Sequence, residues 1–210
     1  MLKLIIKDIV IQKRTIPIAL AYVVFFIFIT SNNLNKGSIY IIGVTLAYMF
    51  TLGAIQYEEK YKAQNVIASL PVTRTDMVFS RYFGMIFFTG ASTVFICIIV
   101  FILNLFNFMP GLENINVQDI KTIIVSAVVL MSIMIPLNYG LGVKKTRFVN
   151  VILYLTFFFG LMNIYENIFM EPGNNPIVTF WSSYGLFIAL VMLALSIVLS
   201  LIIYKNKDIV

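Results

Sequence analysis

The chain has 210 residues, of which 60% are hydrophobic and only 11% are charged. Soluble domains carry about 25% charged residues, so this composition is typical of a polytopic membrane protein and leaves no room for a separate soluble domain. The absence of histidine excludes Ser-His-Asp and Cys-His catalysis, and the single cysteine, Cys97, excludes an intrachain disulfide. The net charge of +6 does not indicate nucleic-acid binding, because the charges sort by membrane side.

Residues 1–14 predict an amphipathic helix at the membrane interface. Their apolar residues recur with helical spacing on one face, while four basic residues can meet anionic lipid headgroups. The apolar set is Leu2, Ile5, Ile6, Ile9 and Val10, and the basic set is Lys3, Lys7, Lys13 and Arg14. The alternative is a cytosolic extension of the first membrane span.

Six apolar stretches then predict six transmembrane helices, so that residues 1–210 form a single all-α transmembrane domain. The expected spans are 16–30, 38–56, 77–106, 120–141, 148–163 and 179–204. Pro136 should kink the fourth span or end its regular part, and residues 142–146 should form a tight basic turn. The mixed apolar and acidic stretch after residue 163 suggests a small outer interfacial or re-entrant element before the last span.

The basic residues predict the orientation of these spans. Of the 15 lysines and arginines, all but Lys36 and Lys121 fall on the side that holds both termini. Because cytoplasmic loops are enriched in Lys and Arg, both termini are expected in the cytoplasm of a multi-pass protein.

The charged stretch from Tyr57 to Tyr82 predicts a helix, a sharp bend and a second helix on the cytoplasmic side. Pro71 disfavours the helical conformation at Leu70 and so ends the first helix. Thr73 and Asp76 have the spacing of a helix N-cap and an acidic residue in the first turn, so the next helix should begin at Thr73. A soluble partner could act on such an element through Glu58 and Glu59 and through an apolar contact of Ile67 and Leu70. The alternative is a solvated loop.

The chemistry of the spans disfavours transport coupled to protons or sodium, because we expect every charged residue to lie at a span end or in a loop. Their neutral polar residues are expected to form hydrogen bonds between helices. They include Thr45, Thr51, Ser92, Thr93, Ser126, Ser132, Asn150 and Ser196. The stretch from Gly140 to Thr146 lacks the spacing of a nucleotide-binding P-loop, so the chain is not expected to be an ATPase and any ATP hydrolysis belongs to a partner.

The stretch with Glu59, Lys60 and S-L-P-V-T-R, placed before a long third span, resembles the ABC-2 type permeases of bacterial ATP-driven exporters. The matching positions are Glu59, Lys60, Ser69, Leu70, Pro71, Val72, Thr73, Arg74 and Arg81. The resemblance covers the layout of the whole chain but only a short stretch in motif.

This resemblance implies an export permease in the bacterial cytoplasmic membrane that contacts membrane lipid and no nucleic acid. It would pair with a second permease subunit, identical or different, and be driven by cytosolic ATPase subunits that bind ATP and magnesium. The helix before Pro71 would be the coupling helix, with Glu58, Glu59, Lys60, Ile67, Leu70, Pro71 and Arg74 as the ATPase-coupling residues. No catalytic, metal or cofactor site is expected in this chain, and the substrate would be an amphipathic or hydrophobic peptide, bacteriocin, drug or lipid. The alternatives are a non-transporting membrane protein, such as a self-protection or assembly factor, and an intramembrane enzyme.

Overall fold

The computed structural model describes residues 2–30, 36–60, 73–106, 115–170 and 176–206. Within these ranges the chain folds into helices and no strand is formed. In order, the helices are α1 (Leu2–Ile11), the 3-10 helix η1 (Gln12–Arg14), α2 (Ile16–Thr30), α3 (Lys36–Lys60), α5 (Arg74–Leu105), α6 (Val117–Leu141), α7 (Val143–Met170) and α8 (Pro176–Lys205).

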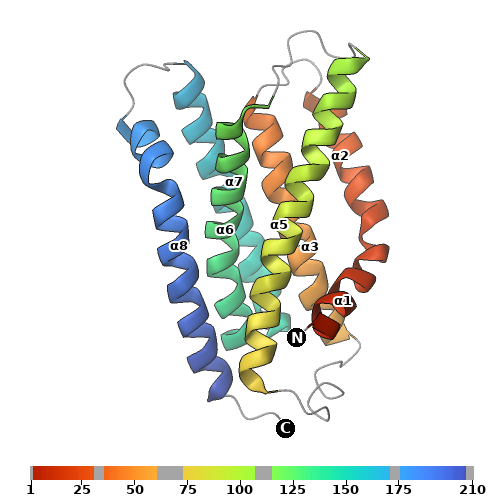
Figure 1. Ribbon diagram of the computed structural model, residues 1–210, viewed down its shortest axis with the longest axis vertical. Coiled ribbons are helices and arrows are strands. Elements are labelled where there is room, and N and C mark those ends of the chain that lie inside the picture. Colours follow the sequence, from red (N-terminus) through yellow and green to blue (C-terminus); the bar gives the residue numbers. More distant parts are fainter. Residues whose placement is uncertain (1, 31–35, 61–72, 107–114, 171–175, 207–210) are drawn as a thin grey trace.

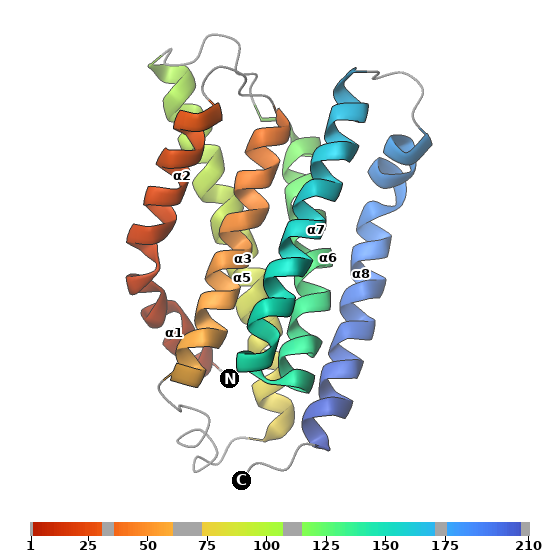
Figure 2. The ribbon, with the colours of Figure 1, turned by 180° about the vertical axis from the view of Figure 1, so that it is seen from behind.

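The long helices stand side by side in one bundle, with α5, α6 and α8 on one face and α2, α3 and α7 on the other (Figures 1 and 2). Helix α6 is central, since it packs against α3, α5, α7 and most extensively against α8. Helix α2 contacts only α3 and η1 appreciably, so it lies at the periphery. The end of α3, the starts of α5 and α7 and the end of α8 lie at the same end of the bundle as α1. We call this end the charged end.

In the part of the chain that the structure describes, four helical segments are long and apolar enough to cross a membrane: Gly37–Glu58, Arg74–Leu105, Val117–Leu141 and Ser183–Lys205. Helix α2 is apolar but shorter, at 15 residues, and α7 is not among the four. The all-helical, multi-pass architecture expected from the sequence is therefore confirmed, while the count of six spans stays a prediction.

The start of α5 is as the sequence predicts. Thr73 is the N-cap residue, and its hydroxyl oxygen accepts a hydrogen bond from the backbone N–H of Asp76 at 3.2 Å. The Thr73 hydroxyl in turn donates to Asp76 Oδ2 at 2.7 Å, and Asp76 lies in the first turn, where a negative charge favours the helix dipole. The helix that we expected to end before Pro71 lies outside the described residues.

Expectations about three later elements are changed by the structure. Pro136 lies inside α6 without ending it, and the kink that was the other expectation stays a prediction. The turn after α6 is confined to Gly142, whose φ of 75° suits glycine, so that Lys144 and Lys145 belong to the first turns of α7. Helix α7 continues to Met170 instead of giving way to a separate outer element, because Pro172 and Gly173, which break helices, come only after that point.

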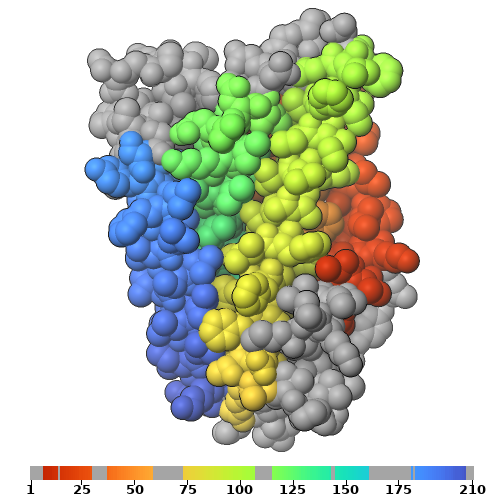
Figure 3. Space-filling view, viewed as in Figure 1, coloured from red at the N-terminus to blue at the C-terminus, as the bar shows by residue number. Residues whose placement is uncertain are grey.

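The interior is a cluster of apolar side chains from α3, α5 and α6, among which Val78, Met85, Ile123, Leu130, Met131 and Met134 are fully buried. Helices α5 and α8 are at the surface in the view of Figure 3. Their exposed residues include the apolar Phe87, Phe101, Phe187 and Leu190. Such an outer surface is expected where lipid replaces water.

Buried hydroxyl and amide groups add polar links between these helices. The Tyr82 hydroxyl lies 2.6 Å from Ser196 Oγ and 2.8 Å from Ser200 Oγ, which joins α5 to α8. Thr45 of α3 bonds to the Tyr154 hydroxyl of α7 at 2.6 Å. Links of this kind were predicted for Thr45 and Ser196 and are confirmed.

Several other polar residues predicted to link helices behave differently. Ser92 and Thr93 donate their hydroxyl groups to the carbonyl of Thr89 in their own helix, which is the local bond that membrane helices make when no partner is in reach. The hydroxyls of Ser126 and Ser132 have no hydrogen-bond partner among the described residues.

Candidate functional site

The charged end of the bundle holds a cluster of four buried or half-buried charges, contributed by three helices. We call Lys7, Asp8, Glu58 and Arg81 the charge cluster. Helix α1 contributes Lys7 and Asp8, α3 contributes Glu58 near its end, and α5 contributes Arg81 two turns after its start. The side chains of Asp8, Glu58 and Arg81 are only 5%, 10% and 11% exposed.

The ion pairs of the charge cluster are arranged around the two ends of the Arg81 guanidinium group. Arg81 Nη2 pairs with Glu58 Oε2, and Arg81 Nη1 lies 3.4 Å from Asp8 Oδ2. Lys7 Nζ pairs with the other oxygen of Glu58 and lies 3.4 Å from Asp8 Oδ1. Two positive and two negative charges cancel, which is the condition under which buried charges are tolerated.

The Asp8 side chain is buried against the bundle. Burial raises the pKa of the Asp8 carboxyl above its ordinary value of 3.8, although Arg81 and Lys7 act in the opposite direction. Asp8 lies on α1, outside the four candidate spans. Its protonation state is therefore sensitive to how closely α1 packs on the bundle.

Tyr139 of α6 extends the charge cluster toward α8. Its hydroxyl is hydrogen-bonded to Arg81, and its ring lies 5.1 Å from the ring of Tyr204 of α8. The Tyr204 hydroxyl contacts Met77 Sδ of α5 at 3.0 Å. Close by in the chain, Arg74 Nη1 donates to the backbone carbonyl of Lys205 at 2.7 Å. The charged end thereby joins α1, α3, α5, α6 and α8.

These contacts add roles for two residues. The Glu58 carboxylate bonds inside the chain to Lys7 and Arg81, and its expected contact with a partner stays a prediction. Lys7 bonds to Glu58, and its expected contact with lipid headgroups stays a prediction. Arg81 and Glu58 lie near helix ends, as expected for charged residues, but they are buried between helices.

Of the other expected ATPase-coupling residues, the structure describes only Arg74 fully. Arg74 is exposed at the start of α5. Glu59 and Lys60 lie in the last turn of α3, but their side chains are outside the described part of the chain, as are Ile67, Leu70 and Pro71 altogether. The structure therefore places Glu58 and Arg74 at the same end of the bundle. The contact of the expected coupling residues with an ATPase stays a prediction.

Asp8 was not expected to be a site residue. A signal was present, because Asp8 is the only acidic residue among the basic ones of residues 1–14. Its buried partner could not be identified from the sequence, since Arg81 lies 73 positions away in the chain.

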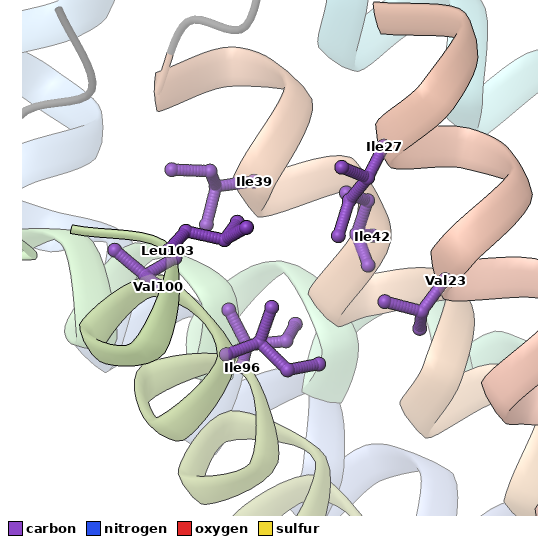
Figure 4. A pocket seen from close by; sticks show the side chains of 8 residues that line it. Val23, Ile27, Ile39, Ile42, Ile96, Val100 and Leu103 are labelled. Carbon is purple, nitrogen blue, oxygen red and sulfur yellow. The ribbon is translucent and has the colours of Figure 1, made fainter. Parts of the chain in front are cut away.

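The opposite end of the bundle holds an apolar crevice between α2, α3 and α5 (Figure 4). Its lining is entirely aliphatic and consists of Val23, Ile27, Ile39, Ile42, Ile96, Ile99, Val100 and Leu103. No side chain in this lining can donate or accept a hydrogen bond, so the surface of the crevice is apolar throughout. Among the described residues no group of His, Cys, Asp and Glu could hold a metal ion.

Comparison with known proteins gives one match. The sequence model of the family described as "ABC-2 family transporter protein" matches residues 3–205, which is almost the entire chain. No curated protein and no solved structure matches. The match supports a permease role and agrees with the all-helical, multi-pass architecture. The chain belongs to the ABC-2 family of transporter proteins.

Proposed function

We propose that this chain is the permease subunit of an ATP-binding-cassette exporter in the bacterial cytoplasmic membrane. Two permease subunits, identical or different, would form the translocation pathway, and separate cytosolic ATPase subunits would bind ATP and magnesium and supply the energy. The family match carries this proposal, because it covers nearly the whole chain. The chain itself is not proposed to be an enzyme.

The contact with the ATPase is proposed to lie between Glu59 and Arg74, with Ile67 and Leu70 as the apolar part and Pro71 as the bend that exposes them. The support is the position of this segment, which leaves the bundle at the end of α3 and returns at the start of α5. Both of these roots lie at the charged end. Glu58 is proposed to hold the root of the segment, because its carboxylate is already bonded within the chain.

The substrate is proposed to be amphipathic or hydrophobic, in the class of peptides, bacteriocins, drugs and lipids. The interior of the bundle is rich in methionine, with Met85, Met131 and Met134 buried, and the described crevice is aliphatic throughout. A path bounded by such surfaces favours a cargo that can itself leave water.

The proposal is tested by gentle purification of the chain from its native membrane into nanodiscs, with mass spectrometry of the proteins that accompany it. We expect a stoichiometric P-loop ATPase, which is lost in the Glu59→Ala and Leu70→Ala variants and retained in the control Val117→Ala. Val117 is an exposed apolar residue at the opposite end of the bundle. Recovery of the chain without an ATPase would contradict the proposal and favour the non-transporting alternative.

A further inference from the structure

Three tyrosines lie together where α3 passes between α2 and α7 (Figure 2). We call Tyr22 of α2, Tyr48 of α3 and Tyr154 of α7 the tyrosine cluster. The rings of Tyr48 and Tyr154 stack with their centroids 5.1 Å apart, and the Tyr22 hydroxyl lies beside the hydroxyls of Thr45 and Tyr154. Tyr22 and Tyr154 are only partly buried, so the tyrosine cluster can be reached from the side of the bundle.

The Tyr22 hydroxyl is a hydrogen-bond donor that the chain does not use. Thr45 donates its hydroxyl hydrogen to the Ile41 carbonyl at 2.7 Å. The hydrogen in the 2.6 Å contact between Thr45 and Tyr154 must therefore come from Tyr154. The Tyr22 hydroxyl is buried and forms no hydrogen bond with any residue that the structure describes.

An unused acceptor lies one turn away on α7. The Tyr48 hydroxyl donates to the backbone carbonyl of Asn150 at 2.9 Å, and Asn150 Nδ2 donates to Asn138 Oδ1 at 3.1 Å. Asn150 is only 3% exposed, yet its Oδ1 atom has no partner in the described part of the chain. Because Asn150 precedes Tyr154 by four residues, both lie on the same face of α7. This face thus combines a free acceptor at Asn150 with the free donor at Tyr22.

A secondary amide carries the complementary pair of groups. Its carbonyl oxygen can accept from the Tyr22 hydroxyl, and its N–H can donate to Asn150 Oδ1. Within a membrane both sides gain from this exchange, because no water is present to satisfy either an amide or an unpaired side chain. The rings of Phe26 and Phe158, at 5.7 Å from Tyr22 and 6.0 Å from Tyr154, offer apolar surface to the groups beside the amide.

We propose that Tyr22 and Asn150 bind secondary amide groups of the transported cargo, so that the permease selects peptides and other amides over esters and hydrocarbons. This inference rests on the proposed function, because it requires that the chain transports a cargo. It narrows the proposed class of substrates and assigns two residues of this chain to their recognition.

The test is photolabelling of the full chain, in nanodiscs with its co-purified ATPase, by N-dodecylacetamide that carries a diazirine in its alkyl chain. The comparison probe is dodecyl acetate with the same diazirine, an ester that lacks the N–H. Mass spectrometry maps the labelled residues, and labelling is followed as a function of the ratio of probe to lipid. We expect saturable labelling of α2, α3 and α7, with half-saturation at a ratio about 2–10-fold lower for the amide than for the ester, the effect of one hydrogen bond.

Tyr22→Phe should raise the half-saturating ratio of the amide by about 2–10-fold. It should not lower the midpoint of thermal unfolding, because the Tyr22 hydroxyl has no described partner to lose. The matched control is Tyr82→Phe, which removes a hydroxyl bonded to Ser196 and Ser200. This control should lower the midpoint and leave the labelling unchanged, so a merely structural role of Tyr22 would give the pattern of the control.

Asn150→Leu removes the free acceptor and should raise the half-saturating ratio of the amide to that of the ester. Since this variant also loses the bond to Asn138, its effect is compared with that on the ester, whose half-saturating ratio should not change. If Asn150→Leu does not fold, the two probes in the unchanged chain and in Tyr22→Phe keep the test decisive.

The outcomes separate the two proposals. If no ATPase accompanies the unchanged chain, the proposed function fails, and the inference about its cargo fails with it. If the ATPase is present, but the amide labels no better than the ester or Tyr22→Phe leaves its labelling unchanged, only the amide site is overturned.

Discussion

At the scale of single residues, Glu58 and Asp8 share Arg81 and Lys7 but differ in what their removal should cost. Glu58 makes the close contact with each cation, whereas Asp8 lies 3.4 Å from both. Each acid is buried, yet burial favours the neutral form of Asp8 in spite of its cationic neighbours. A neutral substitute should thus be tolerated better at Asp8 than at Glu58.

We therefore expect Glu58→Gln to lower the free energy of unfolding by about 3–5 kcal/mol, the usual cost of breaking a buried ion pair. Asp8→Asn should lower it by clearly less. The measurement is unfolding by denaturant in mixed micelles, followed by circular dichroism, for both variants beside the unchanged chain. Equal losses in the two variants would contradict this order.

Asp8 should also make stability depend on pH. Its folded-state pKa is raised above 3.8, so the folded state holds the proton more tightly than the unfolded state. The contribution of Asp8 is thus fully present below pH 3.8 and is lost as the pH rises through the folded-state pKa. We expect the stability difference between the unchanged chain and Asp8→Asn to shrink over that window and then to level off. If the stability difference instead grew with pH over this window, the pKa of Asp8 would be lowered in the folded state and not raised.

At the scale of elements, local sequence signals decided where helices begin. Thr73 and Asp76 were identified as a cap from their spacing, and the structure confirms it, because a cap requires only residues that are neighbours in the chain. The same kind of reasoning placed a turn at Gly142 but made it too long, since nothing local shows how soon α7 begins.

Thr73→Ala should destabilise the start of α5 by about 1 kcal/mol, through loss of the N-cap bond to Asp76. Thr122→Ala is the matched control, because the Thr122 hydroxyl only donates to the Gln118 carbonyl of its own helix. Hydrogen exchange of the first turn of α5 provides the measurement. Equal protection in both variants would argue against the cap.

The link between α5 and α8 gives a second prediction at this scale. Tyr82→Phe removes the hydroxyl shared with Ser196 and Ser200, and such bonds contribute about 0.6 kcal/mol on average within membranes, up to about 1.7. Ser132→Ala, which removes a buried hydroxyl without a described partner, should be neutral. The midpoint of thermal unfolding in nanodiscs is compared for the two variants. If Tyr82→Phe did not lower this midpoint, the hydrogen bonds between α5 and α8 would contribute nothing to stability.

The crossing of α3 with its neighbours depends on Gly43. A Cβ atom there would lie 2.9 Å from Ile123 Cγ2 of α6 and 3.0 Å from Ile96 Cδ1 of α5, closer than carbon atoms pack. We expect Gly43→Ala to be destabilising, as overpacking costs about 1–3 kcal/mol. Gly90→Ala, which meets nothing within 4 Å, should be neutral or stabilising, because alanine favours helices by about 1 kcal/mol over glycine. The free energy of unfolding is measured for both variants. If it changed equally in Gly43→Ala and Gly90→Ala, close packing at Gly43 would not explain the loss of stability.

At the scale of the whole molecule, the distribution of basic residues predicts which end of the bundle faces the cytoplasm. In a Cys97→Ser background, Thr75→Cys at the start of α5 should be protected from a membrane-impermeant maleimide in intact cells. Val117→Cys at the start of α6 should react. Both positions are exposed, so a reversed pattern would overturn the positive-inside orientation.

The sequence by itself determined the helical, multi-pass class, the rough place of each long helix and the cap of α5. Hydropathy and capping depend on residues that are close in the chain, so they can be read without knowing the fold. The motif around Leu70 and Pro71 also sufficed for the family, which the match over residues 3–205 confirms.

Only the tertiary structure decided which side of each helix faces the interior and how the charges are paired. Because lipid is as apolar as the core, a membrane helix can be apolar on every side, and hydropathy does not distinguish its buried face. The partners of Asp8, Glu58 and Arg81 could not be predicted either, because these residues come from three helices that meet only after folding. In the folded chain, charges near the helix ends are buried together as one neutral cluster.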